Sequence, residues 1–159
     1  MLLEILEKAL WAGVAALGFG LLFNIPKSIL TRVFILGFLA GLVKFYCLSF
    51  DCNIITASFF AAILVGILSI LFAQKQHFPI VVFSIPSVIP MIPGYFAYKT
   101  VLAIRQFTFM PEYNLEQIHL LNNIFVNGFT TFFVLFALTT GVSIPMLLLG
   151  KDMTRKVED

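Results

Sequence analysis

Long apolar stretches alternate with short polar interruptions along the chain. A helix that crosses a bilayer needs about 20 mostly apolar residues, and stretches near this length cover residues 5–23, 32–50, 54–73, 78–107 and 120–149. The third stretch carries no charged residue and is the clearest candidate. The pattern therefore predicts an all-α integral membrane protein, a single transmembrane domain of residues 1–159 with about five transmembrane helices.

The fourth stretch carries an interruption of its own. Pro86, Pro90, Pro93 and Gly94 lie inside it, between flanks that are apolar enough for a membrane. A proline within a helix removes a hydrogen bond and clashes with the preceding turn, so these prolines cannot all lie in one regular helix. Non-helical backbone at membrane depth is tolerated only where protein buries it or where it lines a water-filled cavity, and broken helices mark substrate sites in many transporters. We expect the segment 86–94, which includes Ser87, to break the fourth helix and to form part of a permeation site.

Basic residues at the ends of the stretches predict an orientation, because cytoplasmic loops carry an excess of Lys and Arg. Five crossings place the two termini on opposite sides of the membrane. One side then holds Lys27, Arg32, Lys75, Lys151, Arg155 and Lys156, and the other holds Lys8 and Arg105. We expect the N-terminus outside and a cytoplasmic tail at residues 150–159. A re-entrant fourth stretch would move this tail to the other side.

Small residues recur at four-residue spacing in three of the stretches. They are Gly37 and Gly41, then Ser58, Ala62 and Gly66, then Ala137 and Gly141. Such stripes let helix backbones approach closely in lipid. They suit packing inside this chain as well as packing against a partner.

Composition narrows the class of protein. Hydrophobic residues make up 60% of the chain and charged residues 11%, whereas a soluble domain carries roughly 25% charged residues. The net charge of +2 comes without a basic block, so we expect no nucleic-acid partner. Cys47 and Cys52 have no clustered histidine and do not make a metal site. Because no catalytic or phosphate-binding motif is present, we expect neither an enzyme nor a cofactor.

Charged side chains are scarce in the apolar stretches. All acidic residues lie at the ends of the stretches, in links or in the tail. Proton-coupled carriers commonly use buried Asp, Glu or His as relays, so any proton coupling is expected to run through a partner subunit or peripheral groups. Two lysines lie nearer the apolar regions. Lys44 either snorkels to the interface or faces a cavity, and Lys99, which follows Gly94 on the helix leaving the break, either snorkels or joins that helix N-terminus in holding an anion.

Polar residues gather at the start of the fifth stretch. Asn123, Asn127, Thr130 and Thr131 share one helical face. This face either lines a hydrophilic path or supplies hydrogen bonds to neighbouring helices.

Four sequence segments form a recognisable pattern. They are GFGLLFNIP at residues 18–26, AAILVG at 61–66, IPSVIPMIPG at 85–94 followed by Ala97 and Tyr98, and GVSIP at 141–145, which ends on Pro145. The pattern resembles the ThrE-type threonine/serine exporter family, and more closely the small, YjjB-like subunit of the split form of that family. The residues that match the family motif are Asn24, Pro26, Pro86, Pro90, Pro93, Gly94 and Tyr98.

The resemblance implies a subunit of an exporter in the bacterial inner membrane. Its partners would be a larger membrane subunit of the same family, a small-molecule substrate and the lipid bilayer, and a homo-oligomer is left open. The implied substrates are threonine and serine, or dicarboxylates such as succinate. The resemblance also implies that export draws on the proton-motive force.

The leading hypothesis is an exporter subunit for small metabolites that carry a carboxylate. Amides of the break would hold the carboxylate, and freed carbonyls, Asn123 or Asn127 would accept the ammonium of an amino acid. A dicarboxylate would instead need a second cation, such as Lys99 or Lys44. A non-transporting assembly subunit and a passive pore are the alternatives.

Overall fold

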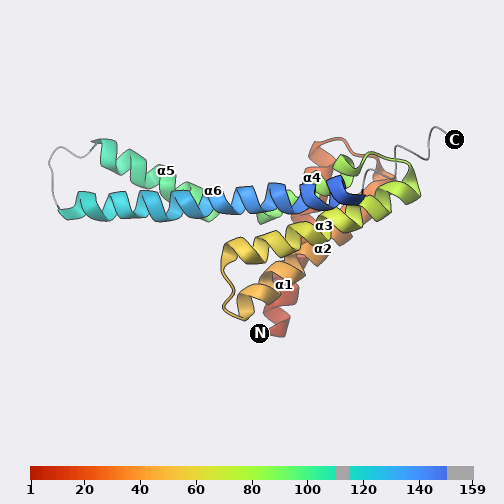
Figure 1. Cartoon of the computed structure of the whole chain (residues 1–159), viewed down its shortest axis with the longest axis horizontal. Helices are drawn as coiled ribbons and strands as arrows, with labels where there is room; N and C mark the ends of the chain where they lie inside the picture. The colour runs from red at the N-terminus through yellow and green to blue at the C-terminus, as the bar shows by residue number, and fades with distance from the viewer. Residues whose placement is uncertain (110–114, 150–159) are drawn as a thin grey trace. The chain divides into compact units, whose positions relative to one another are not determined.

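The computed structural model describes residues 1–109 and 115–149, and for residues 115 and 116 it describes the backbone alone. That part of the chain is built from helices (Figure 1). They are α1 (Leu2–Leu22), α2 (Lys27–Ser49), α3 (Ile54–Gln76), α4 (Ile80–Val88), the short 3-10 helix η1 (Ile89–Met91), α5 (Gly94–Phe109) and α6 (Leu115–Leu149). The expected cytoplasmic tail, residues 150–159, lies outside the described residues.

The helices confirm the all-α membrane fold. Among the described residues, α1, α2, α3 and α6 are each long and apolar enough to cross a membrane, and each overlaps one expected span. The fourth expected span is broken, as its prolines predict: α4 with η1 and α5 qualify as a span only when they are taken together. The number of crossings is therefore four or five by length and composition, and a count of five stays a prediction.

The described chain forms two compact units, residues 1–91 with 137–149, and residues 92–136. In the first unit α2 contacts α1, α3 and α4, and α1 also contacts α4 and η1. The core of this unit is made of buried apolar side chains from α1 to α4, namely Ala16, Ile29, Val33, Leu36, Ala73 and Phe83. The proline-rich break begins inside this first unit, and α5 belongs to the second. Organisation as a single domain stays a prediction.

The turn between α1 and α2 is closed by Asn24 and Pro26. Asn24 has a φ of 54°, in the left-handed region that Asn tolerates better than most residues. The Asn24 N–H donates to the Leu21 carbonyl and the Ile25 N–H to the Gly20 carbonyl, each at 3.0 Å. This pair of bonds is a Schellman motif, which satisfies the last carbonyls of α1. Pro26, which has no N–H to satisfy, then serves as the N-cap of α2.

The glycine stripe of α2 packs against α1. A Cβ atom added to Gly37 would collide with the Cβ of Ala16, and one added to Gly41 would lie 3.0 Å from the Cα of Ala9. The two backbones therefore approach closely, as a small-residue interface allows.

The stripes of α3 and α6 face each other in the same way within the first unit. A Cβ on Gly141 would lie 2.7 Å from the Cβ of Ala62, and a Cβ on Gly66 would lie 2.9 Å from the Val142 carbonyl oxygen and 3.1 Å from Cγ of Pro145. The structure thus decides a choice that spacing left open: these stripes pack inside the chain.

Candidate functional site

The prolines of the break occupy three different backbone positions. Pro86 lies inside α4, Pro90 lies in η1, and Pro93 directly precedes α5. A proline cannot donate a hydrogen bond, so each one leaves an acceptor in the preceding turn without its usual partner. The tighter 3-10 turn at η1 is a common way to end an α-helix under these conditions. The expected break is therefore present, but it is shorter than expected: the α-helix continues through Val88, with Pro86 and Ser87 inside it, and the interruption runs from η1 to Pro93.

Side chains of α4, which leads into the break, are packed into the first unit. Phe83, Ser84, Pro86 and Ser87 are all buried. The Ser87 hydroxyl donates to the Phe83 carbonyl oxygen at 2.7 Å and lies 3.3 Å from the Val33 carbonyl oxygen of α2. These contacts tie α4 to α2, so protein packs closely around the helix that leads into the break.

Lys44 of α2 reaches the break directly. Its side chain is 8% exposed, and its Nζ donates to the Met91 carbonyl oxygen at 2.8 Å. The expectation that Lys44 snorkels to the interface is therefore wrong: the side chain turns inward, to the carbonyl end of η1. A cation is favoured there because the carbonyl end of a helix carries partial negative charge.

Sequence reasoning placed Lys44 among the apolar residues but did not find its partner. The available signal was a charged residue inside an apolar stretch, which in a membrane protein is a functional candidate by default. The missing information was the Met91 carbonyl, a backbone group that no side-chain motif reveals.

Pro93, Gly94, Tyr98 and Lys99 belong to the second unit. The Gly94 N–H donates to the Ile92 carbonyl oxygen at 2.8 Å, and the Pro93 carbonyl oxygen accepts from later N–H groups of α5. A Cβ added to Gly94 would meet no heavy atom within 4 Å, so the space beside this glycine is open.

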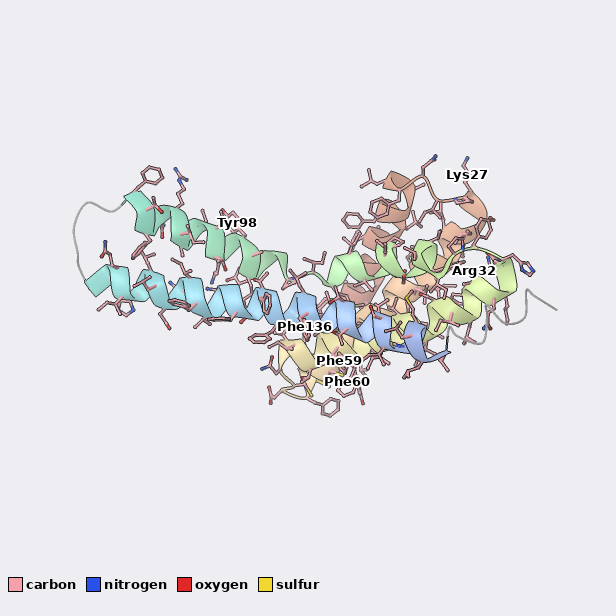
Figure 2. The ribbon with its side chains drawn as sticks, turned by 45° about the horizontal axis from the view of Figure 1, so that its top comes forward. Lys27, Arg32, Phe59, Phe60, Tyr98 and Phe136 are labelled. Atoms are coloured by element: carbon pink, nitrogen blue, oxygen red, sulfur yellow. The ribbon has the colours of Figure 1, made fainter. Side chains whose placement is uncertain are left out.

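Tyr98 and Lys99 lie on the surface of α5. Tyr98 is 63% exposed and points away from α6 (Figure 2). Lys99 is exposed, and its Nζ lies 4.5 Å from the ring centroid of Tyr95, which makes a cation–π contact. A role for Lys99 and the first turn of α5 in holding an anion stays a prediction.

Three side chains on the polar face of α6 donate hydrogen bonds within the helix itself. The Asn127 Nδ2 donates to the Asn123 carbonyl at 2.8 Å, and the Thr130 and Thr131 hydroxyls donate to carbonyls one turn back at 2.7 and 2.8 Å. The expectation that these donors bond to neighbouring helices is therefore wrong for Asn127, Thr130 and Thr131. A hydrophilic path along this face stays a prediction.

Asn24, Pro26 and Pro145 have structural positions. Asn24 and Pro26 build the α1–α2 turn, and Pro145 is buried inside α6 against Gly66. Among residues 1–109 and 115–149 no group of three His, Cys, Asp or Glu side chains is placed to hold a metal ion.

Comparison with known proteins decides the family. The model of the threonine/serine exporter family ThrE matches residues 8–148. The chain belongs to the ThrE family. This membership and the apolar helices together make it a membrane protein, and a transporter family implies a function other than catalysis.

A relative that matches most of the chain is itself longer than the matched region. An uncharacterised protein from Haemophilus influenzae is 31% identical over 150 residues, which cover 92% of this chain and 48% of the relative. The chain thus spans about half the length of the curated relative it matches. No solved structure matches the chain.

Proposed function

We propose that this ThrE-family chain is a subunit of an inner-membrane exporter of small metabolites that carry a carboxylate. The family match over residues 8–148 carries the proposal. The substrates are threonine and serine, with a dicarboxylate such as succinate as the further candidate. A broken helix beside a buried cation, Lys44 on the Met91 carbonyl, suits such substrates, because discontinuous helices and unpaired backbone groups form the sites of many transporters.

A larger membrane subunit of the same family is proposed as the partner. The match covers 48% of the curated relative, so about half of that relative lies outside the matched region, and a partner of this family would supply a corresponding half. Large apolar side chains on α6, such as Phe125, Phe129 and Phe132, are more than half exposed and suit contact with lipid or with a second protein.

The coupling of export to proton movement is proposed to take place in that partner. The acidic side chains that the structure describes are Glu4, Glu7 and Asp51, and all three are exposed near helix ends. A relay inside the described part of the chain would need a buried ionisable acid. The proposed orientation has the N-terminus outside and the tail in the cytoplasm. Lys27 and Arg32 lie in the first turns of α2 (Figure 2), and this end of α2 would then face the cytoplasm.

Efflux from loaded cells tests the proposal. Bacteria without their own threonine exporters would express the chain, a larger ThrE-family membrane protein, or both, and would be fed a threonine-containing dipeptide or loaded with succinate. We expect rapid efflux only with both proteins, and we expect an uncoupler to abolish efflux against a gradient. Equal efflux with and without the chain would contradict the proposal.

The same cells separate the alternatives. An assembly subunit predicts that substitutions at Pro86, Pro90 and Pro93 change the amount of complex and leave the choice between threonine and succinate unchanged. A passive pore predicts flux of a neutral solute that does not depend on the membrane potential. Lys75→Gln, at an exposed lysine near the end of α3, is the control substitution.

A further inference from the structure

The ammonium group of Lys44 stands out among the charged groups of the chain. Among the described residues it is the one charged side chain that is buried. Burying an ion is costly unless an opposite charge and hydrogen bonds compensate it. Its recorded partner is a neutral carbonyl oxygen, that of Met91 at 2.8 Å. The site therefore holds positive charge that the described part of the chain does not neutralise.

Acidic side chains do not supply the missing charge within the described residues. The ion pair recorded there joins the N-terminal ammonium to Glu4, at the other end of α1 from the α1–α2 turn. Glu7 and Asp51 are exposed near helix ends. An ammonium has three N–H donors, and Met91 takes one of them. The two other donors are available to an anion that enters the site.

We infer that Lys44 binds the carboxylate of a zwitterionic α-amino acid, and that the amino acid inserts between Lys44 and the Met91 carbonyl. The substrate carboxylate accepts hydrogen bonds from the Lys44 Nζ. The substrate ammonium donates to the Met91 carbonyl oxygen that Lys44 releases. Each group of the resting pair thereby exchanges its partner for a group of the substrate, so the Lys44 Nζ and the Met91 carbonyl oxygen each keep a hydrogen bond. This inference rests on the proposed export function and assigns a residue and a substrate class to it.

The charge of the site favours an amino acid over a dicarboxylate. One buried cation and one carbonyl oxygen match one carboxylate and one ammonium. A dicarboxylate would bring a second negative charge next to the carbonyl oxygen of Met91, where a donor is needed. The remaining lysines and arginines of the first unit that the structure describes, Lys8, Lys27, Arg32 and Lys75, are not buried, so none of them provides a second buried cation.

Equilibrium binding of radiolabelled threonine to membranes tests the assignment. The membranes would contain the full chain with its partner protein, and threoninamide and succinate would be the competitors. For the wild type we expect unlabelled threonine to compete with the radiolabelled threonine. Succinate should compete poorly, and so should threoninamide, because it lacks the carboxylate. Lys44→Gln keeps an N–H donor for Met91 and removes the charge, so threonine affinity should fall about 10- to 100-fold. Lys44→Arg should recover most of this loss, and Lys75→Gln should have no effect.

The competition pattern separates a binding role from a structural one. A lysine that only caps η1 would change the amount of folded protein but not the preference for threonine over threoninamide. Equal binding by Lys44→Gln and wild type, equal competition by threoninamide, stronger competition by succinate, or no binding to the wild type would each overturn the inference. Threonine efflux that persists in Lys44→Gln would overturn it while the proposed function stands. Absence of efflux from the wild type together with its partner would instead contradict the proposed function.

Discussion

Replacing Gly141 by alanine tests whether α3 and α6 depend on close backbone approach. A Cβ at this position would lie 2.7 Å from the Cβ of Ala62, 2.9 Å from the Phe59 carbonyl oxygen and 3.3 Å from the Ile63 nitrogen. Two of these three atoms belong to the backbone of α3, so no flexible side chain can turn away. The helices must separate at this point for the methyl group to fit.

The magnitude follows from ordinary contact distances. Carbon atoms in van der Waals contact lie about 3.5–4.0 Å apart, so α3 and α6 would have to separate by roughly 1 Å beside Gly141. Overpacking of this kind costs about 1–3 kcal/mol. Alanine also gains roughly 1 kcal/mol over glycine in a helix interior, which offsets part of the cost.

Gly18→Ala is the matched control. Gly18 lies inside α1, and a Cβ there would meet no heavy atom within 4 Å. Both variants gain the same helix propensity, so the difference between them isolates the contact. Thermal unfolding in detergent can be followed by the amount of protein that stays monodisperse. Gly141→Ala should melt about 2–12 °C below Gly18→Ala, because a cost of about 1–3 kcal/mol lowers the melting temperature by about 2–4 °C per kcal/mol in a chain of this size. Coincident melting curves would refute the claimed approach of α3 and α6.

Further substitutions probe the α1–α2 turn and the break. Asn24→Val should lower the free energy of unfolding by about 1–2 kcal/mol relative to Asn24→Gly, because φ is 54° at this residue, and equal stability would contradict this. Gly94→Ala should change stability by less than about 0.5 kcal/mol, because a Cβ there would meet no heavy atom within 4 Å, so any loss of threonine efflux would point to the substrate path. Ser87→Ala should cost about 1 kcal/mol in thermal unfolding, because it removes the hydroxyl that bonds to Phe83 and approaches Val33; an unchanged melting temperature would refute that contribution.

The helices themselves were predictable from the sequence. Apolar length alone identified α1, α2, α3 and α6, because a bilayer imposes a nearly fixed span. The prolines at residues 86, 90 and 93 also predicted the break, because a missing N–H acts locally wherever the chain lies. Asn24 and Pro26 were recognised as motif residues, but the Schellman geometry that explains them appears only in the backbone.

The candidate site was predicted in part. Pro86 and Ser87 were expected in the break, but both lie inside α4, where they are buried and where the Ser87 hydroxyl approaches the Val33 carbonyl of α2. The direction of Lys44 was left open between snorkelling and an inward position, because a long side chain reaches water or the protein interior equally well from the same place; the bond to Met91 excludes snorkelling. Of the two alternatives for the α6 face, hydrogen bonds to neighbouring helices are not what these donors make, because Asn127 and Thr131 find carbonyl acceptors one turn back in their own helix.

The sequence by itself determined that the helices lie in a bilayer, where they run and where one of them is broken. These features depend on hydropathy and on backbone chemistry along one segment. The tertiary structure alone decided which small residues meet, with Gly141 against Ala62, and which carbonyl the Lys44 ammonium reaches. Such pairings join residues that are distant in the chain, and composition or spacing does not encode the partner. The break was an interruption in one apolar stretch; the fold places a buried positive charge beside it.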